Sequence, residues 1–392
     1  MWKVTDGIGR EKTAGLEVGG RKVALMVGER TRDGWRVVGR GVAVADGVRN
    51  GRIVSVPRVG KSIEAAAAMV EDAFGVGLPP VLVGISGNHF CSRSVEGFVS
   101  LPHREMRSDD VRRLKEVVLS GIDRRNDMIH LLPLEYEMDD ENSGLANPLG
   151  KSGKKLAGEF LMLSASAAHR NSLQSARRRA GLEIKGMAPS CLAGVKSVLT
   201  PDEAEQGVVL IDCGKDVTDM AFCYRQRVFH LESMDYGAGR VTAEMSRKLQ
   251  TSANEIERIL AGPYRQKNAE LQVRTYGPHG THLLVRQEVK SLLRKCLLAY
   301  LREVNRHIDR SFSRNILLMG AVLSGGGALF PEIGRLAELV LAMPVQTRDA
   351  GFLSVKDDKQ ESPAGPAWAT AIGLAELALF GNDDTKGDLA WL

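Results

Sequence analysis

The feature that most constrains the fold of this chain is a strand–turn–strand unit at residues 210–222, LIDCGKDVTDMAF. An apolar run reaches Asp212, turns through Gly214 and continues as a second apolar strand from Thr218. Backbone N–H groups at a tight glycine turn can bind phosphate, and a carboxylate at a strand end can hold a hydrated Mg²⁺. The unit is therefore typical of a phosphate-binding hairpin.

A similar unit occurs near the start of the chain. Residues 14–28, AGLEVGGRKVALMVG, contain two β-type runs around the turn Gly19-Gly20, with Glu17 before the turn and Lys22 after it. A glycine pair between two such runs is a hairpin signal. Two hairpins of this kind predict a duplicated α/β fold with a nucleotide between its halves.

Length and composition fit this interpretation. A chain of 392 residues is too long for one compact core, so two or more domains are expected. Hydrophobic residues make up 43% and charged residues 26%, as in ordinary globular proteins. The five cysteines form no C-x-x-C pair and are predicted to be reduced, mostly buried thiols. No signal-peptide core or membrane-spanning run is visible, which favours a cytoplasmic location with peripheral membrane contact at most.

Apolar periodicity predicts further elements in the first part of the chain. Strands are expected at residues 35–44, 51–56 and 81–86. A helix is expected over residues 62–74, with Ser62 as its N-cap. From residue 87 to residue 160, strand-like runs surround a helix capped by Ser108, which predicts an inserted α+β subdomain.

In the second part, residues 263–282 are predicted to be a polar loop and residues 285–312 one long amphipathic helix. The apolar strand before Gly325 runs into three glycines and then a helix, a turn that can lie against a base or ribose. The predicted parts are a first lobe (residues 1–86, 161–206 and 366–392), an insert (87–160), a second-lobe core (207–245 and 316–365) and a second-lobe subdomain (246–315).

Several segments resemble a known superfamily. VVLIDCGKDVTDMAF, MDYGAGRVTAEM, LSGGGALFPEIGRLAELV and AWATAIGL resemble the phosphate, adenosine and connecting motifs of the actin/Hsp70/hexokinase superfamily. Within it the chain most resembles the bacterial cell-division FtsA family, because the stretch HLLPLEY to NPLGKSG in the insert is specific to that family. The resemblance covers residues 14–376, apart from the segment 263–282.

The resemblance implies an actin-like (ribonuclease H-like) two-lobe fold with an FtsA-type insert. It also implies ATP and Mg²⁺ between the lobes and self-association into filaments at the inner face of the cell membrane. The expected partners are the C-terminal tail of the ring protein FtsZ and other division proteins. No nucleic-acid partner is expected, because the basic run Arg177–Arg179 ends a helix, where cations complement the helix dipole.

The motifs also assign candidate nucleotide-binding residues. These are Glu17, Gly19, Gly20, Lys22, Asp212, Gly214, Lys215, Thr218, Gly237, Gly239, Glu257, Gly325, Gly326 and Gly327. Among them, Asp212 is the expected metal ligand, holding Mg²⁺ through water.

Five positions in four motifs depart from the family pattern. Glu17 replaces an aspartate, and Lys215 and Asp216 replace two glycines of the second hairpin. Ser190 stands where the family has an acidic residue, and Leu260 stands where it has a lysine. Since displacements of about 1 Å can cost around 10²-fold in rate, the chain is predicted to be no enzyme, or at most a slow or vestigial ATPase, with binding retained more readily than turnover.

Two further features concern partners. The outer face of the long helix carries Arg286, Lys290, Arg294 and Arg302, which by resemblance face the acidic FtsZ tail. The chain ends GNDDTKGDLAWL, where Trp391 and its apolar neighbours form a weak membrane anchor without a basic cluster. Membrane attachment is then expected to need filament avidity or another protein.

Two alternatives stay open. One is a PilM-like scaffold for type IV pilus assembly, which shares the fold but is disfavoured by the NPLGKSG stretch. The other is a small-molecule kinase of the same superfamily, which would need intact phosphate loops and a catalytic base.

Overall fold

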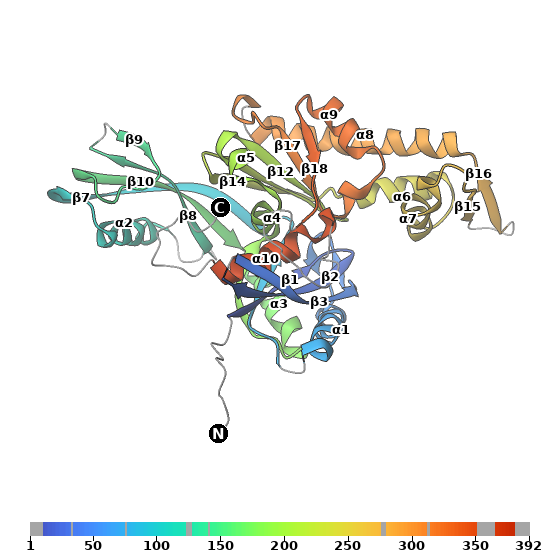
Figure 1. The fold of residues 1–392 in the computed structure, drawn as a ribbon, viewed down its shortest axis with the longest axis horizontal. Helices are drawn as coiled ribbons and strands as arrows, with labels where there is room; N and C mark the ends of the chain where they lie inside the picture. The colour runs from blue at the N-terminus through green and yellow to red at the C-terminus, as the bar shows by residue number, and fades with distance from the viewer. Residues whose placement is uncertain are drawn as a thin grey trace, which may run out of the picture.

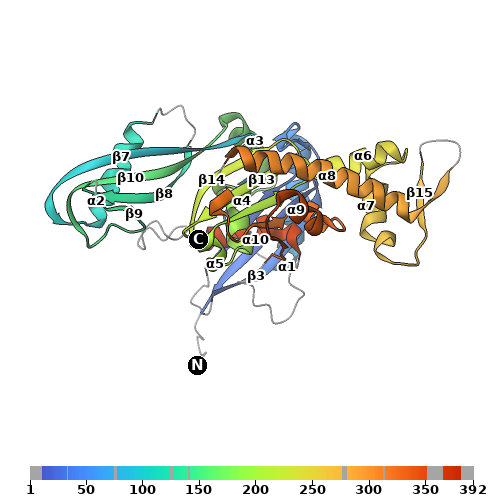
Figure 2. The same ribbon diagram turned by 90° about the horizontal axis from the view of Figure 1, so that it is seen from above.

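The computed structural model describes residues 11–32, 34–74, 77–122, 128–139, 142–275, 280–311, 314–350 and 365–380. Two lobes form the centre of the molecule (Figure 1). An elongated insert projects from one side, and a helical subdomain projects from the opposite side (Figure 2). Within the described residues, no helix is both long enough and apolar enough to cross a membrane.

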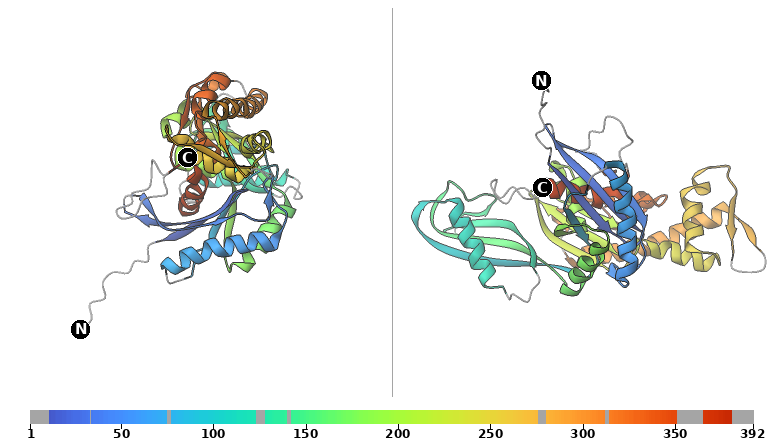
Figure 3. Two further views of the ribbon diagram at one scale, coloured as in Figure 1. Left: turned by 90° about the vertical axis from the view of Figure 1, so that its right-hand side faces the viewer. Right: turned by 90° about the horizontal axis from the view of Figure 1, so that it is seen from below.

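The first lobe is built on a five-stranded sheet in the order β11-β6-β1-β2-β3. Its strands are β1 (Lys12–Val18), β2 (Lys22–Thr31), β3 (Gly34–Val44), β6 (Val81–Ile85) and β11 (Ile184–Pro189). β1, β2 and β3 form an antiparallel meander, and β6 and β11 run parallel to β1. Helix α1 (Val56–Phe74) packs on this sheet with α3 (Ala167–Arg179) beside it (Figure 3).

The second lobe repeats this arrangement. Its sheet has the order β14-β13-β12-β17-β18, with an antiparallel meander of the first three strands and β17 and β18 parallel to β12. The strands are β12 (Val208–Cys213), β13 (Thr218–Tyr224), β14 (Arg227–Met234), β17 (Ala321–Ser324) and β18 (Val345–Thr347). Strand order and direction match the first lobe position by position, so the predicted duplication is confirmed.

Two helices lie between the sheets. α10 (Ala369–Phe380) packs on β1, β2 and β6, and α4 (Ser190–Val198) packs on β12 and β13, with the two helices in contact. Small residues make this contact close: a Cβ at Gly373 would lie 1.8 Å from the carbonyl oxygen of Ala193, and a Cβ at Gly15 would lie 2.5 Å from the backbone nitrogen of Ala375. The lobes therefore meet through a layer that has no room for larger side chains.

The insert is a four-stranded antiparallel sheet in the order β7-β10-β8-β9. Its strands are β7 (Phe90–Glu105), β8 (Met128–Met138), β9 (Asn142–Leu145) and β10 (Ser152–Ala165). Helix α2 (Ser108–Ser120) packs on β7 and buries Leu114 and Val118 in a separate small core with Tyr136 and Phe160. The insert thus folds around its own apolar cluster.

The helical subdomain contains α6 (Gly239–Lys248), α7 (Ala253–Ala261) and one end of α8 (Arg286–Ser311). The predicted long helix is confirmed. Its apolar stripe is buried against the second lobe at Val289, Leu293, Cys296, Leu297, Tyr300, Leu301, Val304 and Ile308. Helix α9 (Ile333–Leu341) packs beside α8.

Three local predictions were wrong. α1 begins at Val56, and the Ser62 hydroxyl lies inside the helix, where it donates to the carbonyl of Val44 at 2.9 Å. The N-cap of α2 is Arg107, whose backbone N–H donates to Asp110 at 2.9 Å, so Ser108 is the first helical residue.

The third wrong prediction is the loop at residues 263–282. It contains the hairpin β15 (Leu271–Arg274) and β16 (Thr281–Leu284), because Leu271 and Val273 alternate inward and are buried. All five cysteines are free and four of them are buried, as predicted.

The first prediction concerns the layer between the lobes. Gly373→Ala should destabilise the protein by about 3 kcal/mol, because the new methyl overlaps the Ala193 carbonyl and overpacking is costly. Gly334→Ala in α9 is the matched control, since the nearest atom to its Cβ is Thr347 Oγ1 at an ordinary 3.5 Å. The control should gain up to about 1 kcal/mol from helix propensity. Urea unfolding measures both, and equal stability of the two variants would contradict the packing described.

A histidine pair lies where the insert joins the first lobe. The rings of His89 and His169 stack with centroids 4.4 Å apart, and both side chains are buried. Burial, together with the neighbouring His89, lowers the pKa of His169 to about 4. In the unfolded chain a histidine titrates near 6.5.

The second prediction follows from this pair. Between about pH 6.5 and pH 4 the unfolded state binds a proton at position 169 that the folded state does not, so the free energy of unfolding falls as the pH falls. The loss should be on the order of 3 kcal/mol by pH 4. His169→Phe keeps a ring and removes the titration, so urea unfolding should show a shallower pH slope. His103→Phe, at an exposed histidine, should keep the wild-type slope; an unchanged slope in His169→Phe would refute the assignment.

Candidate functional site

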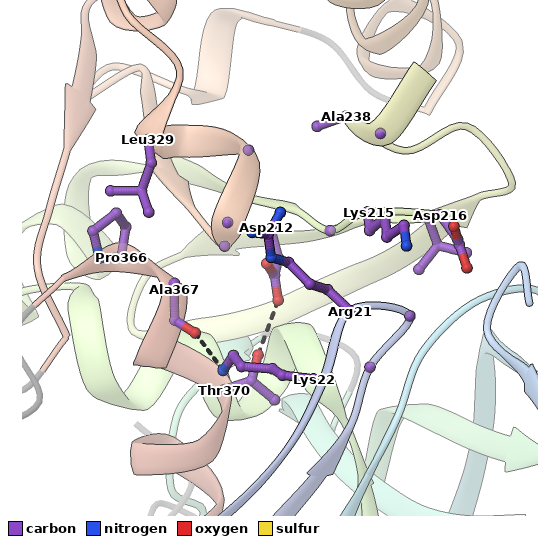
Figure 4. Close-up of a pocket in the computed structure, with 18 of the residues that line it drawn as sticks. Arg21, Lys22, Asp212, Lys215, Asp216, Ala238, Leu329, Pro366, Ala367 and Thr370 are labelled. Atoms are coloured by element: carbon purple, nitrogen blue, oxygen red, sulfur yellow. Dashed lines mark hydrogen bonds between the residues drawn. The ribbon is translucent and has the colours of Figure 1, made fainter. Parts of the chain in front are cut away.

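A cavity of about 880 Å³ lies between the lobes and is lined by residues of both. Three turns define it: the β1–β2 turn, the β12–β13 turn, and the turn from β17 into the short helix η3 (Gly326–Leu329). β1 and β12 hold the same central place in their sheets, and each hairpin turn follows such a strand. The repeated topology therefore brings two turns that are far apart in sequence to one cavity (Figure 4).

Most of the candidate nucleotide-binding residues line this cavity. They are Glu17, Gly19, Gly20, Lys22, Asp212, Gly214, Lys215, Gly239, Glu257, Gly325, Gly326 and Gly327. Thr218 and Gly237 are not among the lining residues. The Thr218 hydroxyl is buried between the Tyr236 carbonyl and the Tyr300 hydroxyl, and the hairpin backbone packs so closely on Gly237 that a Cβ there would lie 2.3 Å from the Lys215 oxygen. Thr218 and Gly237 therefore support the second hairpin through packing and hydrogen bonds on the side that does not line the cavity.

Lys22 is held at the base of the first hairpin. Its Nζ donates to Glu17 Oε2 at 2.8 Å and to the Ala367 carbonyl at 2.7 Å, and it lies 4.6 Å from the ring centre of Trp368 (Figure 4). The ammonium group thus ties the first hairpin to the segment that leads into α10.

Carboxyl groups gather at the end of β12. Asp212 accepts a hydrogen bond from the Thr370 hydroxyl at 2.9 Å, as Figure 4 shows. Burial, the nearby Asp219 and Glu17 raise the pKa of Asp212 to about 7. Burial also raises the pKa of Asp219, which accepts from the Gly87 N–H at 3.3 Å and from the Ser233 hydroxyl. A site that raises carboxyl pKa values in this way favours a cation.

The third turn brings bare backbone to the cavity. Gly325 has a φ of +79°, and a Cβ there would lie 2.2 Å from Asp212 Oδ1. A Cβ at Gly326 would meet no atom within 4 Å, so this residue borders open space. The turn is therefore closely fitted to the second hairpin on one side and open to the cavity on the other.

The far wall of the cavity comes from α7 and the segment after it. Glu257 forms an ion pair with the Arg21 guanidinium of the first hairpin, across the space between the lobes. Leu260 is buried, and Arg265 donates to the Leu329 carbonyl at 2.6 Å and to the Leu260 carbonyl at 3.3 Å. This wall is thus built from an ion pair, an apolar side chain and a cation.

Sequence reasoning missed several lining residues. Arg21, Arg265 and Thr370 were not predicted, although Arg21 directly follows Gly20 and Thr370 lies within the quoted segment AWATAIGL. A cation inside a glycine hairpin was a usable signal. No sequence signal pointed to Arg265, because it enters the cavity from the segment that was predicted to be a loop.

The basic residues of α8 have different surroundings. The Arg286 guanidinium donates to the carbonyls of Pro263, Tyr264, Gln266 and Ala269, so it holds the segment after α7 in place. Lys290 and Arg294 both pair with Glu332 at the start of α9. Arg302 is exposed. Of the four predicted partner-binding residues, the one at position 286 thus has an internal role.

Comparisons with solved structures identify the fold. PilM in a PilM–PilN type IV pilus biogenesis complex has a TM-score of 0.67 at 14% identity, covering 93% of this chain and 98% of that one. MreB5 of Spiroplasma citri bound to ADP has a TM-score of 0.56 at 10% identity, covering 96% and 99%. At these identities the likeness shows the fold alone, which is the predicted actin-like fold.

Comparisons of sequence identify the family. One family model, described as the SHS2 domain inserted in FtsA, matches residues 87–164, and another, described as cell division protein FtsA, matches residues 209–373. Cell division protein FtsA of Pseudomonas aeruginosa is 29% identical over 384 residues, which span 94% of this chain and 90% of that protein. The insert, the second lobe and the nearly full-length relative agree, and the chain belongs to the FtsA family of actin-like cell-division proteins.

Proposed function

We propose that this chain is a cell-division scaffold that forms filaments at the inner face of the cell membrane, tethers the FtsZ ring and recruits other division proteins. The observation that carries the proposal is the FtsA-type insert within an actin-like two-lobe fold. We also propose the domain boundaries predicted from the sequence: two lobes, the insert at residues 87–160 and the second-lobe subdomain at residues 246–315. The C-terminal segment with Trp391, the expected weak membrane contact, lies outside the described residues.

We propose further that the cavity binds ATP with Mg²⁺. Its volume of about 880 Å³ is in the usual range for ligand sites, and the MreB5 relative in fold was solved with ADP. Bound Mg²⁺ would offset phosphate charge, and Asp212 would hold it through water. Among the described residues no group of three His, Cys, Asp or Glu side chains could hold a metal ion.

Hydrolysis has less support than binding. Ser190 lines the cavity where the family resemblance has an acidic residue, and a serine hydroxyl is no general base. Lys22 is shared with Glu17 and Ala367, so it offers less to a phosphate than a free ammonium would. We therefore propose a scaffold whose ATPase activity is slow or vestigial.

We propose that the acidic FtsZ tail docks along α8 at Lys290, Arg294 and Arg302. The first two share the single carboxylate of Glu332, which leaves an excess of positive charge there. Arg302 lies exposed further along the helix. Arg286 supports this face by ordering the segment before it, and the insert is the proposed surface for later division proteins.

Of the alternatives, the pilus scaffold shares the fold with PilM at 14% identity only. The insert match favours the division protein instead. No observation favours the kinase, since the phosphate hairpins carry Lys215 and Asp216 in place of glycines.

The third prediction concerns nucleotide binding. Purified protein should bind ATP in the presence of Mg²⁺, and Asp212→Ala and Gly326→Val should each weaken binding by about tenfold or more, a loss of about 1.4 kcal/mol. A Cβ at position 326 meets no protein atom within 4 Å, so the valine side chain has open cavity space to occupy. Fluorescence titration with a labelled ATP measures the affinity. Asp46→Asn, at a largely exposed carboxylate that pairs with Arg58 and is not among the lining residues of the cavity, is the control that should bind normally.

ADP formation in the same samples, with and without an added sugar, tests the scaffold role, because ATP hydrolysis and phosphoryl transfer to a sugar both produce ADP. Less than one turnover per bound ATP during the titration is the expected result. Rapid turnover on an added sugar would show a kinase and end the scaffold proposal.

The fourth prediction concerns the partner. An FtsZ C-terminal peptide should bind, and Arg294→Glu with Arg302→Glu should weaken binding by about tenfold or more, with the wild-type affinity falling as salt rises. Fluorescence anisotropy measures it. Arg112→Glu with Arg113→Glu, an equal double charge reversal at exposed positions of α2 in the insert, should bind as wild type does. If the wild-type protein ignores the peptide, the tethering role is lost from the proposal.

A further inference from the structure

Asp216 links the two lobes at the hairpin end of the cavity. It belongs to the β12–β13 turn of the second lobe, yet its Oδ2 accepts a hydrogen bond of 3.1 Å from the backbone N–H of Asn50 in the first lobe. The same oxygen lies against the first hairpin, where a Cβ at Gly20 would be only 2.5 Å from it. One carboxylate therefore lies between the second hairpin and two segments of the first lobe (Figure 4).

The donor that meets this carboxylate is fixed in place. Asn50 and Gly51 form the turn between β4 (Val48–Arg49) and β5 (Arg52–Ile53), with φ values of +48° and +68°. This is the two-residue Asn-Gly turn that suits a tight hairpin. The turn also packs on the strand end before the insert, since a Cβ at Gly51 would lie 2.9 Å from the Ser86 carbonyl. The Asn50 N–H is thus preoriented toward Asp216.

A second contact closes the other side of the cavity. Arg21 of the first hairpin pairs with Glu257 of α7, across the lobes. These two contacts, together with the Lys22–Glu17 ion pair, occupy groups that an incoming nucleotide would otherwise meet. Arg21 is engaged by Glu257, Lys22 by Glu17, and the space beside Gly20 by Asp216.

We propose that Asp216 takes the place of a terminal phosphate. A carboxylate and a phosphate are both anions that accept hydrogen bonds from backbone N–H groups at turns. With Asp216 between the hairpins, the lobes are held together at that end without a nucleotide. In the ligand-free protein, the Asp216 carboxylate thus makes contacts between the lobes that a bound phosphate would otherwise make.

A consequence for ligand choice rests on the proposed nucleotide site. A phosphate that extends between the hairpins meets a like charge and competes with Asp216 for the same space. A nucleotide with a shorter phosphate tail avoids this competition. Asp216 is then the residue that lowers the affinity for a nucleoside triphosphate relative to the diphosphate.

Hydrogen exchange tests closure without any nucleotide. In ligand-free protein, the peptide spanning residues 47–55 should exchange at its Asn50 amide at least tenfold faster in Asp216→Ala than in the wild type. Gly20→Ala should do the same by a different route, because its methyl displaces the carboxylate. Asp46→Asn removes a first-lobe carboxylate that pairs with Arg58, and it should exchange as the wild type does. Unchanged exchange in both alanine variants would overturn the proposal.

Affinity measurements test the discrimination separately. Asp216→Ala, and Asp216→Asn, which keeps an acceptor and removes the charge, should each raise the ratio of ATP to ADP affinity by tenfold or more. An unchanged ratio with tight binding of both nucleotides would overturn the discrimination. If no variant binds either nucleotide while exchange still accelerates, the closure by Asp216 is supported and the nucleotide site of the previous section is what fails.

Discussion

The close contact between α4 and α10 is the constraint on which the rest of the structure depends. Each helix packs on a different sheet, and Gly373 lets the backbones approach until there is no space for a methyl group. This thin layer sets the separation of the two sheets. The distance between the sheets determines whether the β1–β2 turn and the β12–β13 turn line one cavity or lie apart in solvent.

The charges in the cavity follow from the same geometry. Two strand ends that carry acidic residues are brought together, so burial and mutual repulsion raise the pKa of Asp212 to about 7. Two of the nearby cations are engaged by carboxylates: Lys22 by Glu17, and Arg21 by Glu257. An anionic ligand that contacts these two side chains must therefore exchange contacts with their present partners.

Much of the fold could be predicted from the sequence because its signals are local. The hairpin at Gly19-Gly20, the hairpin at Gly214 and the helix Arg286–Ser311 each follow from turn residues and apolar spacing within one segment. The insert was recognisable from a family-specific stretch. Element ends were harder: α1 starts six residues before Ser62, and its first turn contains Pro57, a residue type that the start of a helix tolerates.

The site was only partly predictable, since its decisive contacts join residues that are distant in sequence. Nothing near Asp216 indicates that its partner is the Asn50 N–H, and nothing near Glu257 indicates Arg21. Thr218 and Gly237 belong to matching motifs, yet they support the hairpin from behind and do not line the cavity. Likewise the periodicity of α8 predicted its buried apolar stripe correctly but could not show that Arg286 is used by neighbouring carbonyls.

The insert is attached in a way that makes it a lever. The chain enters at Phe90 and leaves at Ala165, two residues paired side by side, and β7 and β10 then run together to the far end. At a rise of about 3.3 Å per residue, the 16 residues of β7 reach roughly 50 Å. A rotation of about 5° at the junction, where His89 and His169 stack, moves the tip by roughly 4 Å over such a length. A small rotation at the junction with the first lobe therefore displaces the far end of the insert by several ångströms, which would change its contacts with a neighbouring molecule.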